Sequence, residues 1–331
     1  MSILPRSQKH SAKHQPKGLH PRNIHKQGYD FESLIKTYPQ LAPHVKTNVH
    51  GNNAIEFSDP LAVKALNRSL LQHHYGVVDW DIPAGALCPP IPGRVDYIHY
   101  VAQLLGCTEP TMMMPSTQST INLLDIGTGA SAIYPLLACK IYGWRCVASD
   151  INTQSLSNVA EIIEKNPTLK DSVTLRVQHD KNHIFEGIIH RGEYFDVSVC
   201  NPPFHASLDE ALKSGQRKVN NLARNRQGKV ARPLNSRASG RQLSVAPANS
   251  NFGGQGAELW CSGGERLFLK KLIKESQAFS TQCRWFTSLI SKVENIKPAK
   301  KLLRKLGALD IRELEMVQGN KVTRILAWTY K

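Results

Sequence analysis

The sequence has no apolar run long enough to cross a membrane, and its first ten residues, MSILPRSQKH, lack the apolar core of a secretory signal. Its seven cysteines are scattered, and none forms the Cys-x-x-Cys pair typical of a zinc or redox site. Thiols without such a pair predict free, mostly buried cysteines rather than a disulfide framework. We therefore expect a cytoplasmic protein with no membrane span and no metal.

Acidic residues are scarce, because 26 Asp and Glu stand against 42 Lys and Arg, which gives a formal net charge of +16. The first acid is Asp30, and residues 1–28 carry six Lys or Arg, so we expect a disordered basic arm there. Residues 213–241 carry nine Lys or Arg and no acid. Such an excess favours a polyanionic partner, either a nucleic acid or an anionic membrane surface.

The pattern of apolar residues divides the rest of the chain in two. Residues 29–110 predict a small, mostly helical region, in which Asp59 and Pro60 open one helix. After a linker, residues 118–331 alternate strand and helix, which predicts an α/β fold with a doubly wound, mostly parallel sheet of seven strands. Gly319-Asn320 indicates an antiparallel hairpin at the C-terminal end. Strands are expected over 121–127, 145–150, 172–179, 194–200, 283–291 and in the hairpin, and helices over 131–143, 153–166, 263–279 and 297–307.

A glycine-rich turn, LLDIGTGAS, joins the first of these strands to the first helix. Gly127 and Gly129 permit a tight turn and a close approach of a ligand, and the turn is expected to aim free backbone N–H groups at that ligand. Asp150 ends the next strand, where an acid takes ribose hydroxyls, although it could also cap the following helix. Gly127-x-Gly129-x-x-Ala132 alone also fits a nicotinamide dinucleotide.

Asp125 favours S-adenosylmethionine over a nicotinamide dinucleotide, because Asp-x-Gly-x-Gly resembles the S-adenosylmethionine sites of the Rossmann-like methyltransferases. In those sites the acid lies near the amino-acid end of the cofactor. Ligands of open α/β sheets bind outside the carboxyl ends of the strands, near the point where strand order reverses. The fourth strand is expected beside the first, so the corner that follows it should face the cofactor.

That corner reads Asn201-Pro202-Pro203-Phe204, a rigid turn directly after the apolar run FDVSVC. It could be no more than a turn. An exocyclic amine such as adenine N6, however, is a poor nucleophile, because its lone pair is delocalised into the ring. The Asn201 side-chain oxygen and the Pro202 carbonyl can each accept one N6 hydrogen, while Phe204 stacks on the base. The base must leave its stack to reach this corner, and no general base is required.

Longer stretches resemble a known family over nearly the whole chain from about residue 18. LHPRN, DPLAVKALN, CPPIPGRVDYIH, LLDIGTGASAIYPLL, CNPPFH, NFGGQGAELWCSGGE, WFTSLIS and AWTY together resemble the bacterial 23S rRNA adenine-N6 methyltransferases, with a human methyltransferase-like RNA adenine-N6 methylase as a more distant relative. The resemblance implies a Rossmann-like fold, S-adenosylmethionine as cofactor, and 23S rRNA or an assembling large subunit as partner.

The resemblance also implies roles for particular residues. Arg94 would contact the cofactor carboxylate, Gly127 and Ser131 would line the pocket, and Asp150 would hold the ribose. Asn201 would be the catalytic residue. The loop HDKNH would cover the cofactor adenine through either Asp180 or Lys181, and both remain candidates.

The chain departs from the family by a longer segment between CNPPFH and NFGGQ, so we expect an insertion over residues 205–256. It could be a solvated, disordered insertion. We instead expect it to clamp RNA beside the target pocket, through Arg217, Lys218, Arg224 and Arg226.

Two other classes of function remain open from the sequence. A protein glutamine N5-methyltransferase also uses Asn-Pro-Pro, but usually ends the motif with Tyr and needs no basic arm. A non-catalytic RNA-binding protein on a methylase scaffold would have no need of Asp125, Gly127, Asp150 and Asn201 together. Composition does not distinguish RNA from DNA.

Overall fold

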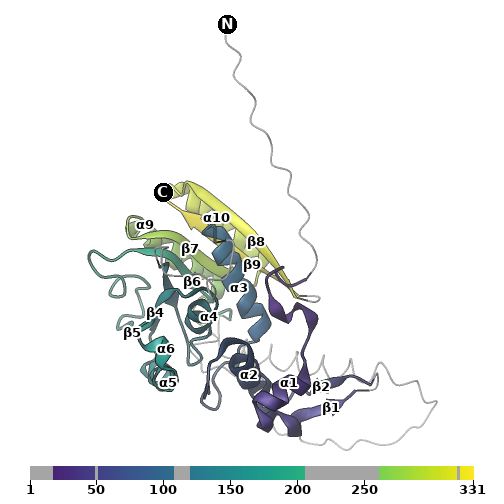
Figure 1. Cartoon of the computed structure of the whole chain (residues 1–331). Helices are drawn as coiled ribbons and strands as arrows, with labels where there is room; N and C mark the ends of the chain where they lie inside the picture. The colour runs from purple at the N-terminus through teal and green to yellow at the C-terminus, as the bar shows by residue number, and fades with distance from the viewer. Residues whose placement is uncertain (1–17, 49–50, 108–119, 206–260, 319–320) are drawn as a thin grey trace, which may run out of the picture.

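The computed structural model describes residues 18–48, 51–107, 120–205, 261–318 and 321–331. Figure 1 colours these residues along the chain. The predicted RNA-binding residues Arg217, Lys218, Arg224 and Arg226 lie outside the described ranges, as does the rest of the 213–241 segment. Among the described helices, none has both the length and the apolar character needed to cross a bilayer.

The predicted Rossmann-like α/β fold is confirmed, with one sheet of seven strands in the order β5-β4-β3-β6-β7-β9-β8. Neighbours among β3 to β7 pair in parallel, whereas β9 pairs antiparallel with both β7 and β8 and so forms the predicted C-terminal hairpin. The strands are β3 (Asn122–Ile126), β4 (Arg145–Asp150), β5 (Val173–Val177), β6 (Phe195–Cys200), β7 (Cys283–Ile290), β8 (Asp310–Gln318) and β9 (Lys321–Thr329).

Helices cover both faces of the sheet (Figure 1). Side chains alternate between the faces along each strand, so Leu123 packs into one hydrophobic cluster and Leu124 into the other. The first cluster is covered by α4 (Ile133–Tyr142) and α5 (Thr153–Glu164), and the second by α9 (Gly264–Ala278) and α10 (Ile296–Lys305). The short α6 (Pro167–Lys170) and the 3-10 helix η4 (Val293–Asn295) precede β5 and α10 respectively.

The N-terminal region packs on the same face as α4 and α5, because α3 contacts both α4 and β8. Asp59 caps α2 by accepting the Leu61 N–H at 2.9 Å, and Pro60 is its first residue, as the sequence predicts. The small antiparallel pair of strands was not predicted. The elements are η1 (Ile24–Gln27), α1 (Phe31–Thr37), η2 (Pro39–His44), β1 (Val45–Thr47), β2 (Asn53–Ile55), α2 (Pro60–Tyr75) and α3 (Ile91–Leu104).

Residues 18–28 differ from the expected disordered arm, because they are folded onto α3. His20, Asn23 and His25 are buried. The Asn23 amide donates to the Pro92 carbonyl at 2.9 Å, and the Arg22 guanidinium donates to the carbonyls of Cys107 and His99 at 2.9 and 3.1 Å. The expectation rested on charge alone, and it fails here because distant backbone carbonyls satisfy the polar groups of the segment. Residues 1–17 lie outside the described residues.

Candidate active site

The carboxyl ends of β3, β4 and β6 meet at one edge of the sheet. Ile126 of β3 is in register with Ser149 of β4 on one side and with Cys200 of β6 on the other. Gly127 and Asn201 are the next residues of β3 and β6, on strands about 4.8 Å apart. The glycine turn and the Asn-Pro-Pro-Phe corner are therefore neighbours, as the switch-point rule predicts.

The glycine turn uses its backbone N–H groups internally, contrary to our expectation that they would be free for a ligand. Gly127 and Thr128 both donate to the Ser149 carbonyl at 2.9 Å, and Gly129 donates to the Asp150 carboxylate at 2.8 Å. A dinucleotide needs such N–H groups for its pyrophosphate. Because neighbouring residues of β4 occupy them, the turn suits a cofactor without phosphates better than a dinucleotide.

Glycine is required at position 127 by backbone angle rather than by space. Its φ is 73°, a left-handed conformation that favours glycine, whereas a Cβ built there would meet no atom within 4 Å. The space beside the turn is open on that side. This is consistent with the predicted close approach of a ligand to Gly127.

Two side chains that sequence reasoning missed hold the turn in place. The Trp80 indole N–H donates to the Ser131 carbonyl at 3.0 Å, and the Asn158 amide donates to the Ala130 carbonyl at 2.8 Å. Trp80 is only 1% exposed, so its N–H is shielded from water and would have no acceptor without this bond. The buried Ser131, predicted to line the pocket, is thus fixed from behind by the N-terminal region.

Asp125 is fully buried at the end of β3, and among the described residues neither of its carboxylate oxygens has a partner in hydrogen-bonding geometry. Burial raises the pKa of this carboxyl to about 7. The Thr128 hydroxyl is close enough to lower that pKa, Asp150 raises it as a like charge, and Arg94 lowers it. A buried carboxylate without a partner destabilises the folded protein, so Asp125 is a candidate for pairing with a bound ligand.

Arg94, predicted to contact the cofactor, lies in the first turn of α3 beside α4. One of its terminal nitrogens donates to the Tyr134 hydroxyl at 2.5 Å, and its guanidinium carbon lies 5.4 Å from the centre of the Tyr134 ring. Its Nε is buried without a partner in the described part of the chain. Arg94 is close enough to Asp125 to lower its pKa, and each of the two residues has buried polar atoms without a partner among the described residues.

Asp150 ends β4, and both of its oxygens accept backbone N–H groups, from Gly129 and from Asn152, each at 2.8 Å. It does not cap α5, because the N-cap is Asn152, whose side chain accepts from Gln154 and Ser155. A carboxylate has lone pairs left for further donors. The predicted contact of Asp150 with a ribose stays a prediction.

The Asn-Pro-Pro-Phe corner follows β6 directly. Pro202 is buried, while Asn201, Pro203 and Phe204 are half-buried. Within the described ranges, the Asn201 side-chain oxygen is buried and has no hydrogen-bond donor. An acceptor that is shielded from water and left unpaired is what the binding of an N–H group would satisfy.

A ring of hydrogen bonds supports this corner from α3 and β7. The Cys200 N–H donates to the Tyr97 hydroxyl at 3.3 Å, and the Thr287 hydroxyl donates to the Ser198 carbonyl at 2.8 Å. The hydroxyl oxygens of Tyr97 and Thr287 are 2.7 Å apart. Because the Thr287 hydroxyl hydrogen is already donated to Ser198, the Tyr97 hydroxyl donates to Thr287. Tyr97 is fully buried and was missed from the sequence, where only its helical position could be read.

Asp180 and Lys181 are exposed in the loop after β5, at the same edge of the sheet. Asp180 accepts the Asn182 N–H at 2.7 Å, and the Lys181 carbonyl accepts from the Lys271 ammonium at 2.7 Å. Neither contact favours one of them over the other as a partner of the cofactor adenine.

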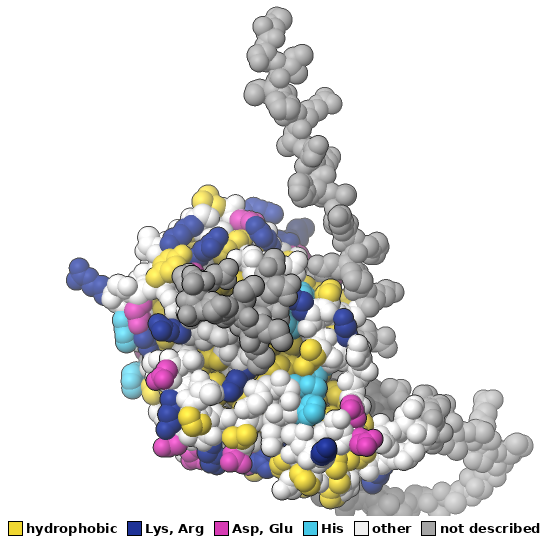
Figure 2. Space-filling model, viewed as in Figure 1, with side chains coloured by type: hydrophobic (Ala, Val, Ile, Leu, Met, Phe, Trp, Pro, Cys, Tyr) yellow, Lys and Arg dark blue, Asp and Glu magenta, His cyan; other side chains and the backbone are white. Residues whose placement is uncertain are grey.

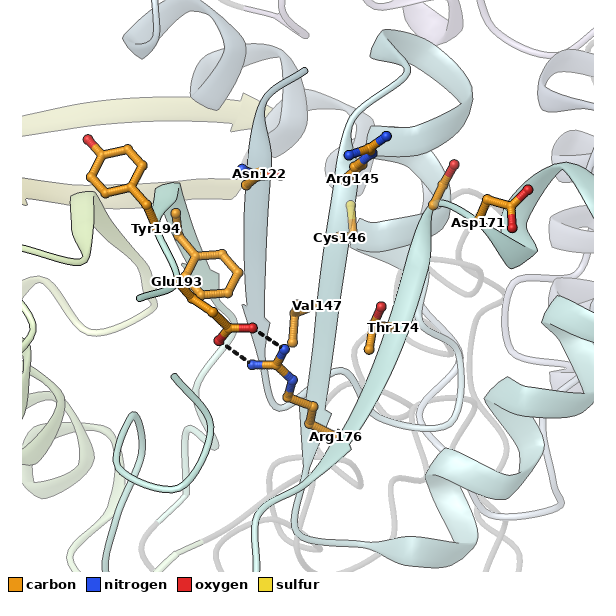
Figure 3. Close-up of a pocket in the computed structure, with 11 residues that line it drawn as sticks. Asn122, Arg145, Cys146, Val147, Asp171, Thr174, Arg176, Glu193 and Tyr194 are labelled. Carbon is orange, nitrogen blue, oxygen red and sulfur yellow. Dashed lines mark hydrogen bonds and ion pairs between the residues drawn. The ribbon is translucent and has the colours of Figure 1, made fainter. Parts of the chain in front are cut away.

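A hollow of about 320 Å³ lies away from this site, at the amino ends of the strands. Figure 3 shows Arg176 and Glu193 pointing toward each other there, joined by two hydrogen bonds of 2.5 and 2.7 Å. This pair lowers the pKa of Glu193 to about 2. Arg176 also donates to the Ile188 carbonyl, and Glu193 also accepts the His190 N–H, so both groups are bonded within the protein and we interpret this hollow as structural.

One group of possible metal ligands occurs in the described part of the chain, formed by His183, Glu186 and Glu275. Glu275 already accepts the backbone N–H groups of Ile184, Phe185 and Glu186 at 2.8 to 3.1 Å. A carboxylate that fixes a turn in this way is explained without an ion.

The fold is that of the Rossmann-like S-adenosylmethionine-dependent methyltransferases. The structure is similar to the catalytic domain of human METTL16 in complex with MAT2A 3′UTR hairpin 1, with a TM-score of 0.74 and 30% identity over 95% of this chain and 96% of that one. It is also similar to the N-terminal domain of human METTL16 in complex with SAH, with a TM-score of 0.71 and 26% identity over 95% and 100% of the two chains.

Sequence comparison identifies the family within this class of methyltransferases. The family model Methyltransf_10, described as RNA methyltransferase, matches residues 13–331. Ribosomal RNA large subunit methyltransferase F of Saccharophagus degradans is 56% identical over 321 residues, covering 96% of both chains, and that of Shewanella loihica is 52% identical over 324 residues, covering 95% of this chain and 79% of the relative. The chain belongs to this family of RNA methyltransferases.

Proposed function

We propose that this protein uses S-adenosylmethionine to methylate N6 of one adenine in 23S rRNA. One observation carries the proposal: the Asn201 oxygen is a buried acceptor without a donor among the described residues, next to the glycine turn. A corner that served only as a turn would have no need of such an atom. An amine nitrogen placed against it would supply the missing donor.

The residues at the edge of the sheet fit the proposed cofactor, which supplies an electrophilic methyl group when bound. Its amino-acid end carries one ammonium and one carboxylate. Among the described residues, the site offers the Asp125 carboxylate, which has no hydrogen-bond partner, and the Arg94 guanidinium, whose Nε has none. Gly127, Gly129 and Ser131 would line the pocket, and Asp150 would hold the ribose. Either Asp180 or Lys181 would cover the adenine.

The chain's own part in the reaction is to position the target amine. The Asn201 oxygen and the Pro202 carbonyl would each accept one N6 hydrogen, which favours a pyramidal nitrogen whose lone pair is available for attack. Pro202 and Pro203 keep the corner rigid, and Phe204 would stack on the base, an interaction worth about 1–3 kcal/mol in other proteins. The amine is acidic once it has received the methyl group, so it loses its proton without a general base. Positioning therefore accounts for the rate.

The proposed partner is 23S rRNA, either naked or in an assembling large subunit. The names of the relatives support this partner, and the net charge of +16 supports contact with a polyanion. The site of action would then be the cytoplasm. Arg217, Lys218, Arg224 and Arg226 follow the corner along the chain and are proposed to contact phosphates.

The test is to map N6-methyladenine in rRNA from cells with and without the gene, and to restore it with purified protein and S-adenosylmethionine. We expect one adenine of 23S rRNA to lose its methyl group in the deletion strain. A full set of rRNA modifications in that strain would contradict the proposal. Methyl transfer to a glutamine of a release-factor peptide, instead of to rRNA, would favour the protein methyltransferase.

A further inference from the structure

The outer surface of α9 and α10 is strongly cationic. α10 buries Ile296, Ala299 and Leu303 against the sheet and has no acidic residue along its length. Figure 2 shows several Lys and Arg side chains on the upper part of the molecule, where Figure 1 places α10 and the C-terminal strands. The cationic surface is defined by seven exposed residues: Arg266, Lys270, Lys274, Lys297, Lys301, Arg304 and Lys305.

None of these seven side chains has a carboxylate partner within 4.0 Å in the part of the chain that the structure describes. The neighbouring cations do: Lys300 pairs with Glu313, Arg312 with Asp310, and Arg324 with Glu315. Like charges four residues apart on a helix repel each other and destabilise it. Both helices repeat that spacing, so a cost remains that a bound polyanion would offset.

The cationic surface begins at the edge of the sheet that carries Asn201. The Cys261 N–H donates to the His205 carbonyl at 3.1 Å, which places the start of α9 beside the corner. Glu265 then accepts from Ser291, Lys292 and Asn295 at 2.5 to 3.0 Å, which ties the start of α10 to the start of α9. Both helices thus lead away from the site, on the opposite face of the sheet from the N-terminal region.

A hollow of about 390 Å³ interrupts this surface beside α10. It is lined by Val293, Ile296, Lys297, Lys300, Arg304 and Glu313. The volume falls in the range of small-ligand sites. Its lining combines two apolar side chains with three cations and one carboxylate, that of Glu313, which pairs with Lys300.

We infer that the cationic surface of α9 and α10 binds the phosphate backbone of the RNA that flanks the target adenine. The inference rests on the proposed function. RNA that places one base at the Asn201 edge continues on both sides of that base, and this face offers exposed cations from that edge outward. A membrane is the weaker candidate, because the apolar side of α10 is buried and leaves little to insert into lipid.

The test compares two matched full-length triple variants in a salt series with transcribed 23S rRNA. Lys297→Gln, Lys301→Gln and Arg304→Gln remove three cations from the surface. The control, Lys165→Gln, Lys170→Gln and Arg191→Gln, removes three exposed cations elsewhere. We expect the slope of log affinity against log salt to fall by about two to three for the α10 variant and to stay at the wild-type value for the control. Should the α10 variant not fold, Arg266→Gln, Lys270→Gln and Lys274→Gln on α9 replace it, with the same expected fall.

Two further readouts separate the possible failures. Methylation of 23S rRNA by the wild-type protein is measured in parallel by nucleoside mass spectrometry. If the wild type methylates rRNA but the α10 variant and the control have the same slope of log affinity against log salt, the inference that the cationic surface binds RNA is overturned. The proposed function then stands. If the wild type methylates no adenine, the proposed function fails instead. Loss of binding to phosphatidylglycerol vesicles, with an unchanged RNA slope, would assign the surface to a membrane and overturn the inference.

Discussion

Asn201 combines burial of its side-chain oxygen with the lack of any donor to it among the described residues. Buried acceptors in folded proteins are nearly always paired, so an exception at a strand end calls for an external donor. Asp125 presents the same situation one strand away, with a carboxylate in place of an amide. In the proposed function, Asn201 would meet the target amine and Asp125 the cofactor, and each role can be tested separately.

Replacing Asn201 with Ala should abolish methyl transfer while leaving cofactor binding intact. The substitution removes only the acceptor for the amine, and the groups around Asp125 are untouched. We expect the affinity for S-adenosylhomocysteine in calorimetry to stay within about two-fold of wild type, and kcat to fall by about 100-fold or more, the scale on which loss of a positioned polar group acts. Turnover near the wild-type rate would contradict the proposed role of Asn201.

Binding of S-adenosylhomocysteine should tighten as pH rises from 6 to 8. Because the pKa of Asp125 is about 7 in the free protein, its carboxyl is mostly protonated at pH 6 and ionised at pH 8, when it can pair with the ligand's ammonium. At one pH unit below the pKa only about a tenth of the carboxyl is ionised, so the affinity should be roughly ten-fold lower than at high pH. Calorimetry at several pH values checks this, with Asp125→Asn as the control that should bind weakly and lack this dependence.

The same carboxyl has the opposite effect on the stability of the unliganded protein. Its folded-state pKa is raised from 3.8, so its contribution to stability is full below pH 3.8 and is lost as pH rises toward 7. S-adenosylhomocysteine should therefore raise the melting temperature most at pH 7 to 8, where ionised Asp125 contributes least to the stability of the free protein. If ligand affinity is flat over this range in the wild type, Asp125 does not meet the ammonium.

At the scale of secondary-structure elements, α3 connects the N-terminal region to the end of β6. It supplies Tyr97 to the hydrogen-bond ring that includes Ser198 and Cys200, just before Asn201. It also supplies His99, whose ring bonds the Tyr142 hydroxyl of α4 at 2.7 Å. One buried Tyr hydroxyl thus lies against the corner, and another lies between the same helix and α4.

Tyr97→Phe should lower kcat, and Tyr142→Phe should not. Both variants lose a buried hydroxyl and should lose about 1–3 kcal/mol of stability, measured by denaturant unfolding. Only Tyr97 supports the backbone of Asn201, and a small displacement of a positioning group can reduce the rate severely. We expect kcat to fall about ten-fold or more at unchanged KM for the cofactor. Equal effects of the two substitutions on kcat would reduce Tyr97 to a packing role.

The sequence predicted the elements that depend on local chemistry. The Asp125 to Gly129 turn and the Asn201 corner were found because each motif directly follows an apolar strand. Trp80, Tyr97 and Asn158 were missed, because their role comes from partners 28 to 190 residues away. Residues 18–28 were misassigned for the same reason, since Arg22 bonds carbonyls 77 and 85 residues away.

At the scale of the whole molecule, the basic insertion is expected to add to RNA binding without affecting cofactor binding. Replacing Arg217, Lys218, Arg224 and Arg226 with Ala should weaken binding of cognate and non-cognate RNA alike, because phosphate contacts carry no sequence information. The log–log salt slope should flatten by roughly one for each phosphate that is no longer neutralised. Affinity measurements across a salt series test this, with cofactor affinity as the control. An unchanged slope would make the segment a solvated insertion.

The strand order has a consequence for how the molecule is made. β9 follows β8 in the chain but lies between β7 and β8 in the sheet. While the chain is being synthesised, β8 leaves the ribosome with no strand to pair with, and β7 keeps an open edge until β9 arrives. β9 also supplies Ile325 and Ala327 to one hydrophobic cluster, and Leu326 and Trp328 to the other. A nonsense mutation just before β9 would therefore detach two strands and open both sides of the core, although it deletes a segment of only about ten residues.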